Sequence, residues 1–254
     1  MHISTRLLML AAVAASAAPA AAGERDDWTG VYAGVHGGYD RIDTEADVTL
    51  GGAWSTQPQA LRDFVAENMA TSQKDDDFNM GLQLGYNHQF GSIVVGAEAA
   101  ITSFHSDETV TTGPIRQTPT ATTSYTFTNT VKPDAMATLK AKVGFTTGST
   151  LFYADGGLAL TRVRFGSSIT SSANYLKDGS ITDEVDGYVV GGGIEQRFSE
   201  HLSARIGYNY ADMKDLSYTT TYRTGSALTN PAYTETVTQD LRMHLVQVGV
   251  NYRF

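Results

Sequence analysis

The stretch FNMGLQLGYNHQF, residues 78–90, decides the fold. Apolar side chains occupy every second position from Phe78 to Tyr86 and again at Phe90, and the positions between them are Asn, Gly or Gln. An amphipathic helix would need apolar spacings of three and four, whereas a period of two puts one apolar and one polar face on a β-strand. The sequence therefore predicts a strand here, and His88 alone breaks its apolar set.

The same alternation recurs along the chain. It is found in seven further segments: 29–39, 92–101, 135–146, 150–160, 186–198, 202–210 and 242–254. Together with residues 78–90, these segments predict eight strands of about ten residues each.

The connections between the strands alternate strictly between short and long. Residues 91–92, 148–149 and 199–201 have hairpin lengths. Four long connections, rich in Thr, Ser, Asp and Asn, cover 40–77, 105–133, 164–183 and 212–240. This pattern predicts an all-β fold, an eight-stranded antiparallel up-and-down transmembrane β-barrel with four long extracellular loops.

A soluble β-sandwich is the competing interpretation, because it also tolerates long loops at one end. The faces opposite the apolar ones carry Gly, Asn, Gln, Lys, Glu and Arg, which suits a polar lumen better than a dry core. Aromatic residues also gather near the short turns, as an interfacial girdle requires. They are Phe90, Phe145, Phe152, Phe198, Tyr252 and Phe254. Both features favour the barrel.

The N-terminus predicts export. Arg6 precedes an apolar stretch of residues 7–18, and small residues allow cleavage after Ala22, so residues 1–22 read as a signal peptide and 23–254 as the barrel domain. Loss of Arg6 leaves 17 basic against 27 acidic side chains, a formal charge of −10. This acidic chain is not expected to bind nucleic acid. The absence of cysteine excludes disulfides and thiolate chemistry.

Two segments at the ends of the mature chain carry a resemblance to a known family. WTGVYAGVHGGY, residues 28–39, and VQVGVNYRF, residues 246–254, are similar to the ends of small Gram-negative outer-membrane barrels of the RopB type from alphaproteobacteria. Weaker similarities lie between them, in VVGAEA, YADGGLA, VGGGIEQRF and RIGYNY. The resemblance implies an eight-stranded barrel related to the OmpA membrane domain, in the outer membrane of the cell.

If the apolar positions face lipid, charged side chains of the opposite parity face the lumen. A two-residue turn at 148–149 places Lys142 opposite Asp155, and a three-residue turn at 199–201 places Glu195 opposite Arg205. Facing residues lie about 4.5–5.5 Å apart, so we expect ion pairs, with Glu98 joining Lys142. Because eight strands enclose a lumen that side chains just fill, these pairs are interpreted as filling rather than as a channel.

The C-terminal strand, QVGVNYRF, ends on an aromatic residue. The alternation turns Tyr252 and Phe254 toward lipid at the periplasmic interface. In the family that the sequence resembles, such a strand is the signal read by the barrel assembly machinery.

Other candidate sites are weaker. His105, Ser106 and Asp107 adjoin on one strand, where neighbours alternate faces and cannot form a triad unaided, so no catalytic residue is predicted. The run Asp75 to Asp77 lacks the spacing of a dedicated metal site and is interpreted as a solvated loop end. Helical spacing after Pro58 predicts a short loop helix whose apolar face either binds a partner or caps the barrel mouth, and capping is the favoured interpretation.

The sequence therefore predicts a non-enzymatic outer-membrane protein with a mainly structural, surface-exposed role and no cofactor or metal. Its expected partners are outer-membrane lipid, lipopolysaccharide and the assembly machinery. The rival functions are a narrow porin for small polar solutes, and an adhesin or ligand binder that uses the long loops, with haem among the candidate ligands.

Overall fold

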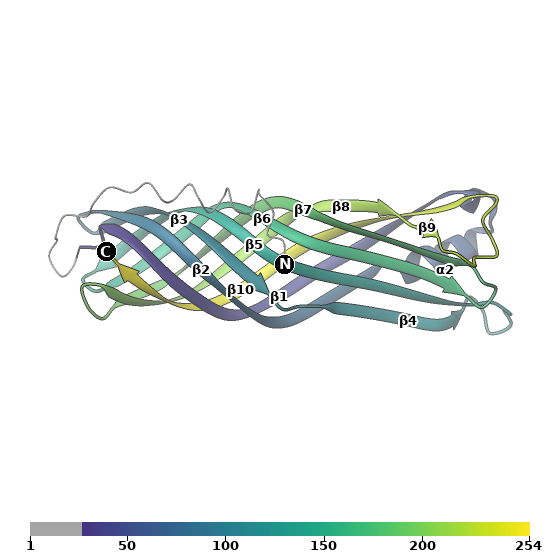
Figure 1. Cartoon of the computed structure of the whole chain (residues 1–254), viewed down its shortest axis with the longest axis horizontal. Helices are drawn as coiled ribbons and strands as arrows, with labels where there is room; N and C mark the ends of the chain where they lie inside the picture. Colours follow the sequence, from purple (N-terminus) through teal and green to yellow (C-terminus); the bar gives the residue numbers. More distant parts are fainter. Residues whose placement is uncertain (1–26) are drawn as a thin grey trace.

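The computed structural model describes residues 27–254, so the predicted signal peptide lies outside the described residues. The described chain forms an antiparallel sheet that closes into a barrel (Figure 1). Its order is β3-β2-β1-β10-β8-β7-β6-β5-β4, and pairing of β3 with β5 closes the ring. The predicted eight-stranded antiparallel barrel is confirmed, with β4 and β9 extending β3 and β8 beyond the ring.

The elements have the following bounds. The strands are β1 (Gly30–Gly52), β2 (Thr71–Phe90), β3 (Ile93–Phe104), β4 (Glu108–Arg116), β5 (Ser124–Thr147), β6 (Thr150–Ser171), β7 (Leu176–Arg197), β8 (Leu202–Thr219), β9 (Thr221–Tyr222) and β10 (Tyr233–Arg253); the helices are the 3₁₀ turn η2 (Ala53–Thr56) and α2 (Gln59–Met69). Neither helix within residues 27–254 is long and apolar enough to cross a membrane.

The short turns are as predicted. Phe90 pairs with Ile93, and Thr147 pairs with Thr150, so each of these turns has two residues. Gly91 and Gly148 have φ of 63° and 62°, in the left-handed region that glycine adopts without a steric penalty. These hairpins lie at the same end of the barrel as the C-terminus (Figure 1).

The predicted strand length is wrong. Outside β3, β4 and β9, the strands have 18 to 24 residues, about twice the length needed to span a bilayer as a tilted strand. Most of the four predicted long loops is therefore strand. The barrel wall continues well past the apolar band, and the helices η2 and α2 lie at its far end (Figure 1).

The two halves of the barrel have opposite polarity. On β10, Val246, Val248 and Val250 point outward, and Gln247 and Asn251 point into the lumen. From Val246 toward the extracellular end, the same alternate positions still point inward, but the polarity of the two faces of the strand is exchanged. The inward residues become apolar, and the outward ones become polar or charged: Leu241, Met243 and Leu245 lie inside, whereas Thr238, Asp240, Arg242 and His244 lie outside.

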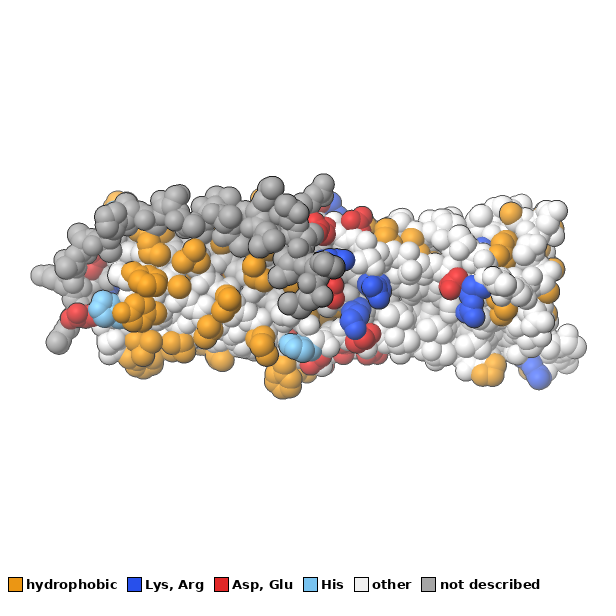
Figure 2. All heavy atoms as spheres, in the orientation of Figure 1, with side chains coloured by type: hydrophobic (Ala, Val, Ile, Leu, Met, Phe, Trp, Pro, Cys, Tyr) orange, Lys and Arg blue, Asp and Glu red, His pale blue; other side chains and the backbone are white. Residues whose placement is uncertain are grey.

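This inversion marks the membrane boundary. The outward apolar run from Val246 of β10 to Phe254, the residue after the strand, covers nine residues, which matches the 9–11 residues of a tilted membrane-spanning strand. Figure 2 shows apolar side chains gathered on the half that carries the C-terminus, and charged ones near the middle of the barrel. Exposed ion pairs follow the apolar band, including Arg41 with Asp76 at 2.8 Å and Lys214 with Asp186 at 2.6 Å.

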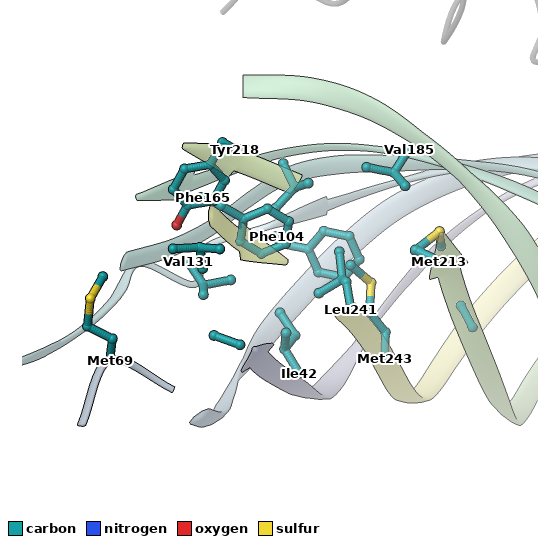
Figure 3. Packing of buried hydrophobic residues seen from close by; sticks show 14 of the residues in the cluster. Ile42, Met69, Phe104, Val131, Phe165, Val185, Met213, Tyr218, Leu241 and Met243 are labelled. Atoms are coloured by element: carbon teal, nitrogen blue, oxygen red, sulfur yellow. The ribbon is translucent and has the colours of Figure 1, made fainter. Parts of the chain in front are cut away.

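The extracellular half has a packed apolar core. Phe104, Phe165, Met213 and Met243 point into it from different strands (Figure 3). Val65 and Met69 of α2 are buried in the same cluster. The helix therefore covers the barrel mouth from inside, as the spacing after Pro58 predicts, although Pro58 is the N-cap rather than the first helical residue.

The boundary can be tested with two substitutions on β10. Val250→Arg is expected to lower the free energy of unfolding in lipid vesicles by about 2–4 kcal/mol, because its side chain lies in the middle of the apolar band. Thr238→Arg, also outward but on the water side, is expected to change it by less than about 0.5 kcal/mol. Denaturant unfolding of both variants measures this difference, and equal losses would rule out a boundary between the two positions.

Candidate functional site

The membrane-spanning half of the lumen is organised around Glu98, on β3, which is fully buried. Arg205 Nη1 lies 2.5 Å and Lys142 Nζ 3.4 Å from its Oε2 atom, and Lys140 Nζ lies 3.5 Å from Oε1. The Tyr32 hydroxyl also donates to Oε2 at 2.8 Å. Three cations therefore share one carboxylate: Lys140 and Lys142 come from β5, and Arg205 comes from β8.

The predicted pairs differ from the observed ones. The Cα register places Lys142 opposite Asp155 and Glu195 opposite Arg205, as the turn lengths require. Among the described residues, however, Lys142 and Arg205 both contact Glu98, and the contact of Glu98 with Lys142 is the one expected. Arg205 crosses the narrow lumen from β8, whereas Lys142 turns away from Asp155 on β6 to Glu98 on β3, its neighbour on the other side of β5.

The two remaining predicted carboxylates have other partners. Asp155 accepts a bond from Lys140 Nζ at 2.9 Å. Glu195 accepts bonds from Ser203 Oγ at 2.5 Å and Asn251 Nδ2 at 2.9 Å. The sequence registers fix which residues face one another, but not which of several nearby groups a flexible side chain reaches.

A layer of hydrogen-bonded amides continues the filling toward the extracellular half. Gln83 Nε2 donates to Asn251 Oδ1 at 2.8 Å, and Gln247 Nε2 donates to Asn79 Oδ1 at 3.0 Å. The His36 ring nitrogens lie 2.5 Å from Gln83 Oε1 and 3.0 Å from Thr102 Oγ1. A cavity beside His36 and Glu98 has room for no more than about one water molecule.

Trp28 closes the periplasmic mouth, and sequence reasoning did not single it out. Its side chain is fully buried, and the guanidinium carbons of Arg197 and Arg253 lie 4.3 and 4.9 Å from its ring centroid. Its indole nitrogen donates to the Gly148 carbonyl at 3.2 Å. A guanidinium against an aromatic face is attractive, so this arrangement holds the start of the barrel wall against its C-terminal strand.

The extracellular end is held by a second buried cluster, around Glu235, which was also not predicted. Lys177 Nζ lies 2.5 Å from Glu235 Oε2, and Tyr175 and Trp54 donate to Oε1 at 2.5 and 2.7 Å. Burial and the neighbouring carboxylate of Glu235 raise the pKa of the Tyr175 hydroxyl, which therefore stays a hydrogen-bond donor. The cluster ties η2 to β7 and β10 above the apolar core.

The other candidate residues do not assemble into a site. His105 is exposed, Ser106 bonds Asp75, and Asp107 pairs with Lys132. Asp76 pairs with Arg41 across the outer surface. Within residues 27–254, no three His, Cys, Asp or Glu side chains are grouped as metal ligands would be.

The C-terminal aromatic side chains lie on the outer surface. Tyr252 and Phe254 are exposed, and their ring centroids lie 5.3 Å apart. The other predicted girdle residues are exposed beside them at the short-turn end: Phe90, Phe145, Phe152 and Phe198.

Comparison with known proteins agrees with this architecture. The 31 kDa outer-membrane immunogenic proteins of Brucella melitensis biotype 1 and Brucella suis biovar 1 are each 26% identical over 244 residues, which covers 94% of this chain and 89% of theirs. The crystal structure of the outer membrane protein OprG from Pseudomonas aeruginosa superimposes with a TM-score of 0.51 at 13% identity, covering 91% of this chain and all of that one. This second similarity shows the fold.

A family model described as the outer membrane protein beta-barrel domain matches residues 8–254. That match spans the whole barrel wall, with its apolar outer band and its filled lumen. The chain is therefore a member of the outer membrane protein beta-barrel family and resides in the outer membrane.

Proposed function

We propose that this protein is a non-conducting structural barrel, anchored in the outer membrane and presenting a rigid polar extension to the exterior. The observation that carries the proposal is that the interior is closed at three successive levels. Trp28 with its two arginines lies at the periplasmic mouth, the Glu98 cluster lies in the lumen, and the apolar core lies in the extracellular half. A hydrated path would have to cross all three.

The apolar core is the level that argues most strongly against the porin alternative. Water and ions crossing it would replace contacts among side chains such as Phe165, Leu241 and Met243, each nearly or fully buried. Small polar solutes gain nothing there, because burial of a polar group without a partner is costly. No reaction step is proposed, since the buried charges contact one another rather than a substrate space.

Three further proposals concern export of the chain, assembly of the barrel and its contact with lipopolysaccharide. We propose that residues 1–22 are a secretion signal and that Tyr252 and Phe254 are read by the barrel assembly machinery. Their exposure on the terminal strand supports the second role. We also propose that lipopolysaccharide contacts the ring of exposed charges that follows the apolar band, of which Arg41 and Asp76 are one pair.

Conductance tests the proposal directly. Purified protein in planar bilayers is expected to give no current steps, because three closures act in series. The variant Trp28→Ala is expected to stay silent as well, since it opens one level and leaves two. Regular steps from the wild-type barrel would overturn the proposal in favour of the narrow porin.

A further inference from the structure

The extracellular half of the barrel contains a sheet edge that the chain leaves unpaired. Pairing of β2 with β3 stops at Asn79 and Phe104. Beyond that point β4 continues along β5, from Glu108 opposite Val131, and has β5 as its one neighbour in the described sheet. The facing part of β2, from Thr71 to Asp77, pairs with β1 alone.

The opening between β2 and β4 is here called the seam. Side chains close it at its membrane-side end and bridge it on the lumen side. Ser106 Oγ bonds the Asp75 carboxylate at its membrane-side end. Behind it, Asn129 of β5 donates to the carbonyl of Met69, at the end of α2, and to Thr71 Oγ1 at 2.7 Å. Side chains therefore bridge the gap in the wall from inside, and β4 lies outside these contacts.

The free stretch of β4 is short and has defined limits. The register shifts after Thr112, and Pro114 has no N–H to offer. Thr109, Thr111 and Thr112 are exposed. Glu108 to Thr112 thus presents unpaired main-chain groups, with polar side chains beside them, on the water side of the boundary.

We propose that this edge of β4 binds an extended segment of another polypeptide, which adds to the sheet as an extra strand. Main-chain hydrogen bonds along Glu108 to Thr112 supply the binding, as in other cases of strand addition. The segment enters from the exterior, because Ser106 and Asp75 close the seam toward the membrane. This inference goes beyond the proposed structural role and does not depend on whether the barrel conducts.

Topology argues against a second copy of the chain as the occupant. Barrels in one membrane share their orientation, so two β4 edges would meet as parallel strands, the less stable pairing. A segment from another molecule can run antiparallel to β4.

Charge defines the chemistry of the segment. Glu108, at the membrane-side end of the free edge, is half-buried and has no ion-pair partner among the described residues. We therefore expect basic side chains in the segment, since complementary charge favours association.

The probe is a fluorescein-labelled peptide of sequence Lys-Thr-Val-Thr-Val-Thr-Lys, added to the full barrel in phosphatidylcholine vesicles. Anisotropy measures its affinity. The same peptide with Pro in place of the central Thr is expected to bind about tenfold more weakly, because it loses main-chain bonds to the edge. Glu108→Gln is expected to weaken binding of the basic peptide while leaving binding of a peptide with Gln at both ends unchanged.

Hydrogen exchange locates the peptide. Added peptide is expected to slow exchange in residues 108–112 and not in residues 236–238 of β10, whose strand is paired on both sides. Equal affinity for the proline peptide, protection elsewhere, or no binding at millimolar peptide would each overturn the proposal. If the barrel conducts no current and also does not bind the peptide, the structural role is still supported and strand addition is not.

Discussion

Replacing Glu98 with Gln is expected to lower the free energy of unfolding by about 3–5 kcal/mol, as when one partner of a buried ion pair is removed. The substitution keeps the size of the side chain but leaves Lys140, Lys142 and Arg205 around a neutral amide in the closed lumen. Two of these cations then lose their ion-pair carboxylate, since Asp155 contacts Lys140 alone among the three. Urea unfolding in vesicles, followed by the mobility of unboiled protein on gels, measures the loss.

Two comparisons make this result specific. Asp76→Asn removes a carboxylate from an exposed pair with Arg41 and is expected to have a much smaller effect. Adding Lys142→Met to Glu98→Gln is expected to recover part of the lost stability, because it removes a cation left without a partner. A loss no greater than that of Asp76→Asn would contradict the assignment of Glu98 as the centre of the cluster.

The second large effect is expected from Leu241→Ala, which should lower the free energy of unfolding by about 2–5 kcal/mol. Leu241 is 1% exposed and packs in the extracellular core shown in Figure 3, where its loss leaves a cavity among rigid neighbours. The matched control is Leu82→Ala, at a position of 64% exposure on the lipid-facing surface. Acyl chains fill the space left there, so its loss of unfolding free energy is expected to be much smaller.

The same unfolding experiment measures both leucine variants. If the extracellular half were an open, hydrated loop region, Leu241→Ala would cost no more than Leu82→Ala. That outcome would argue against the packed core, and with it against the third closure of the barrel.

The strand count, the turns and the facing of the lumen charges could be predicted because they depend on local pattern. Alternation of two assigns each side chain to a face, and a turn of known length fixes the register, as for Lys142 opposite Asp155. The side-chain partners could not be predicted. Lys140 faces Glu98 only because β5 pairs with β3 to close the ring, and Arg205 reaches Glu98 across the lumen, which depends on strand tilt and barrel width rather than on sequence spacing.

The extracellular half was misjudged for a different reason. Its strands alternate as regularly as the others, but Thr and Ser take the outward places and the apolar residues point inward. In β10 the odd positions run without interruption from Val237 through Leu245 to Arg253, all buried. A search for continued parity, rather than for apolar outward faces, would have extended the strand past Val246.

No local sequence pattern marks Trp28 or Glu235 as the centre of a buried cluster. Trp28 precedes the first strand, and its burial depends on Arg197 and Arg253, which are far away in sequence. Glu235 reads as one acidic residue in a Thr-rich stretch. Its partners Tyr175 and Lys177 are brought to it from β7 and the turn before β7 by closure of the barrel.

The inversion of polarity along the strands also sets how deep the protein sits. A downward shift of two residues, about 7 Å along a strand, would draw Arg41 and Arg242 into hydrocarbon, and an equal upward shift would lift apolar side chains such as Tyr39 into water. A bilayer of another thickness must therefore deform around the barrel, because the barrel cannot slide to suit it. The unpaired edge of β4 is thus carried at a constant height above the lipid.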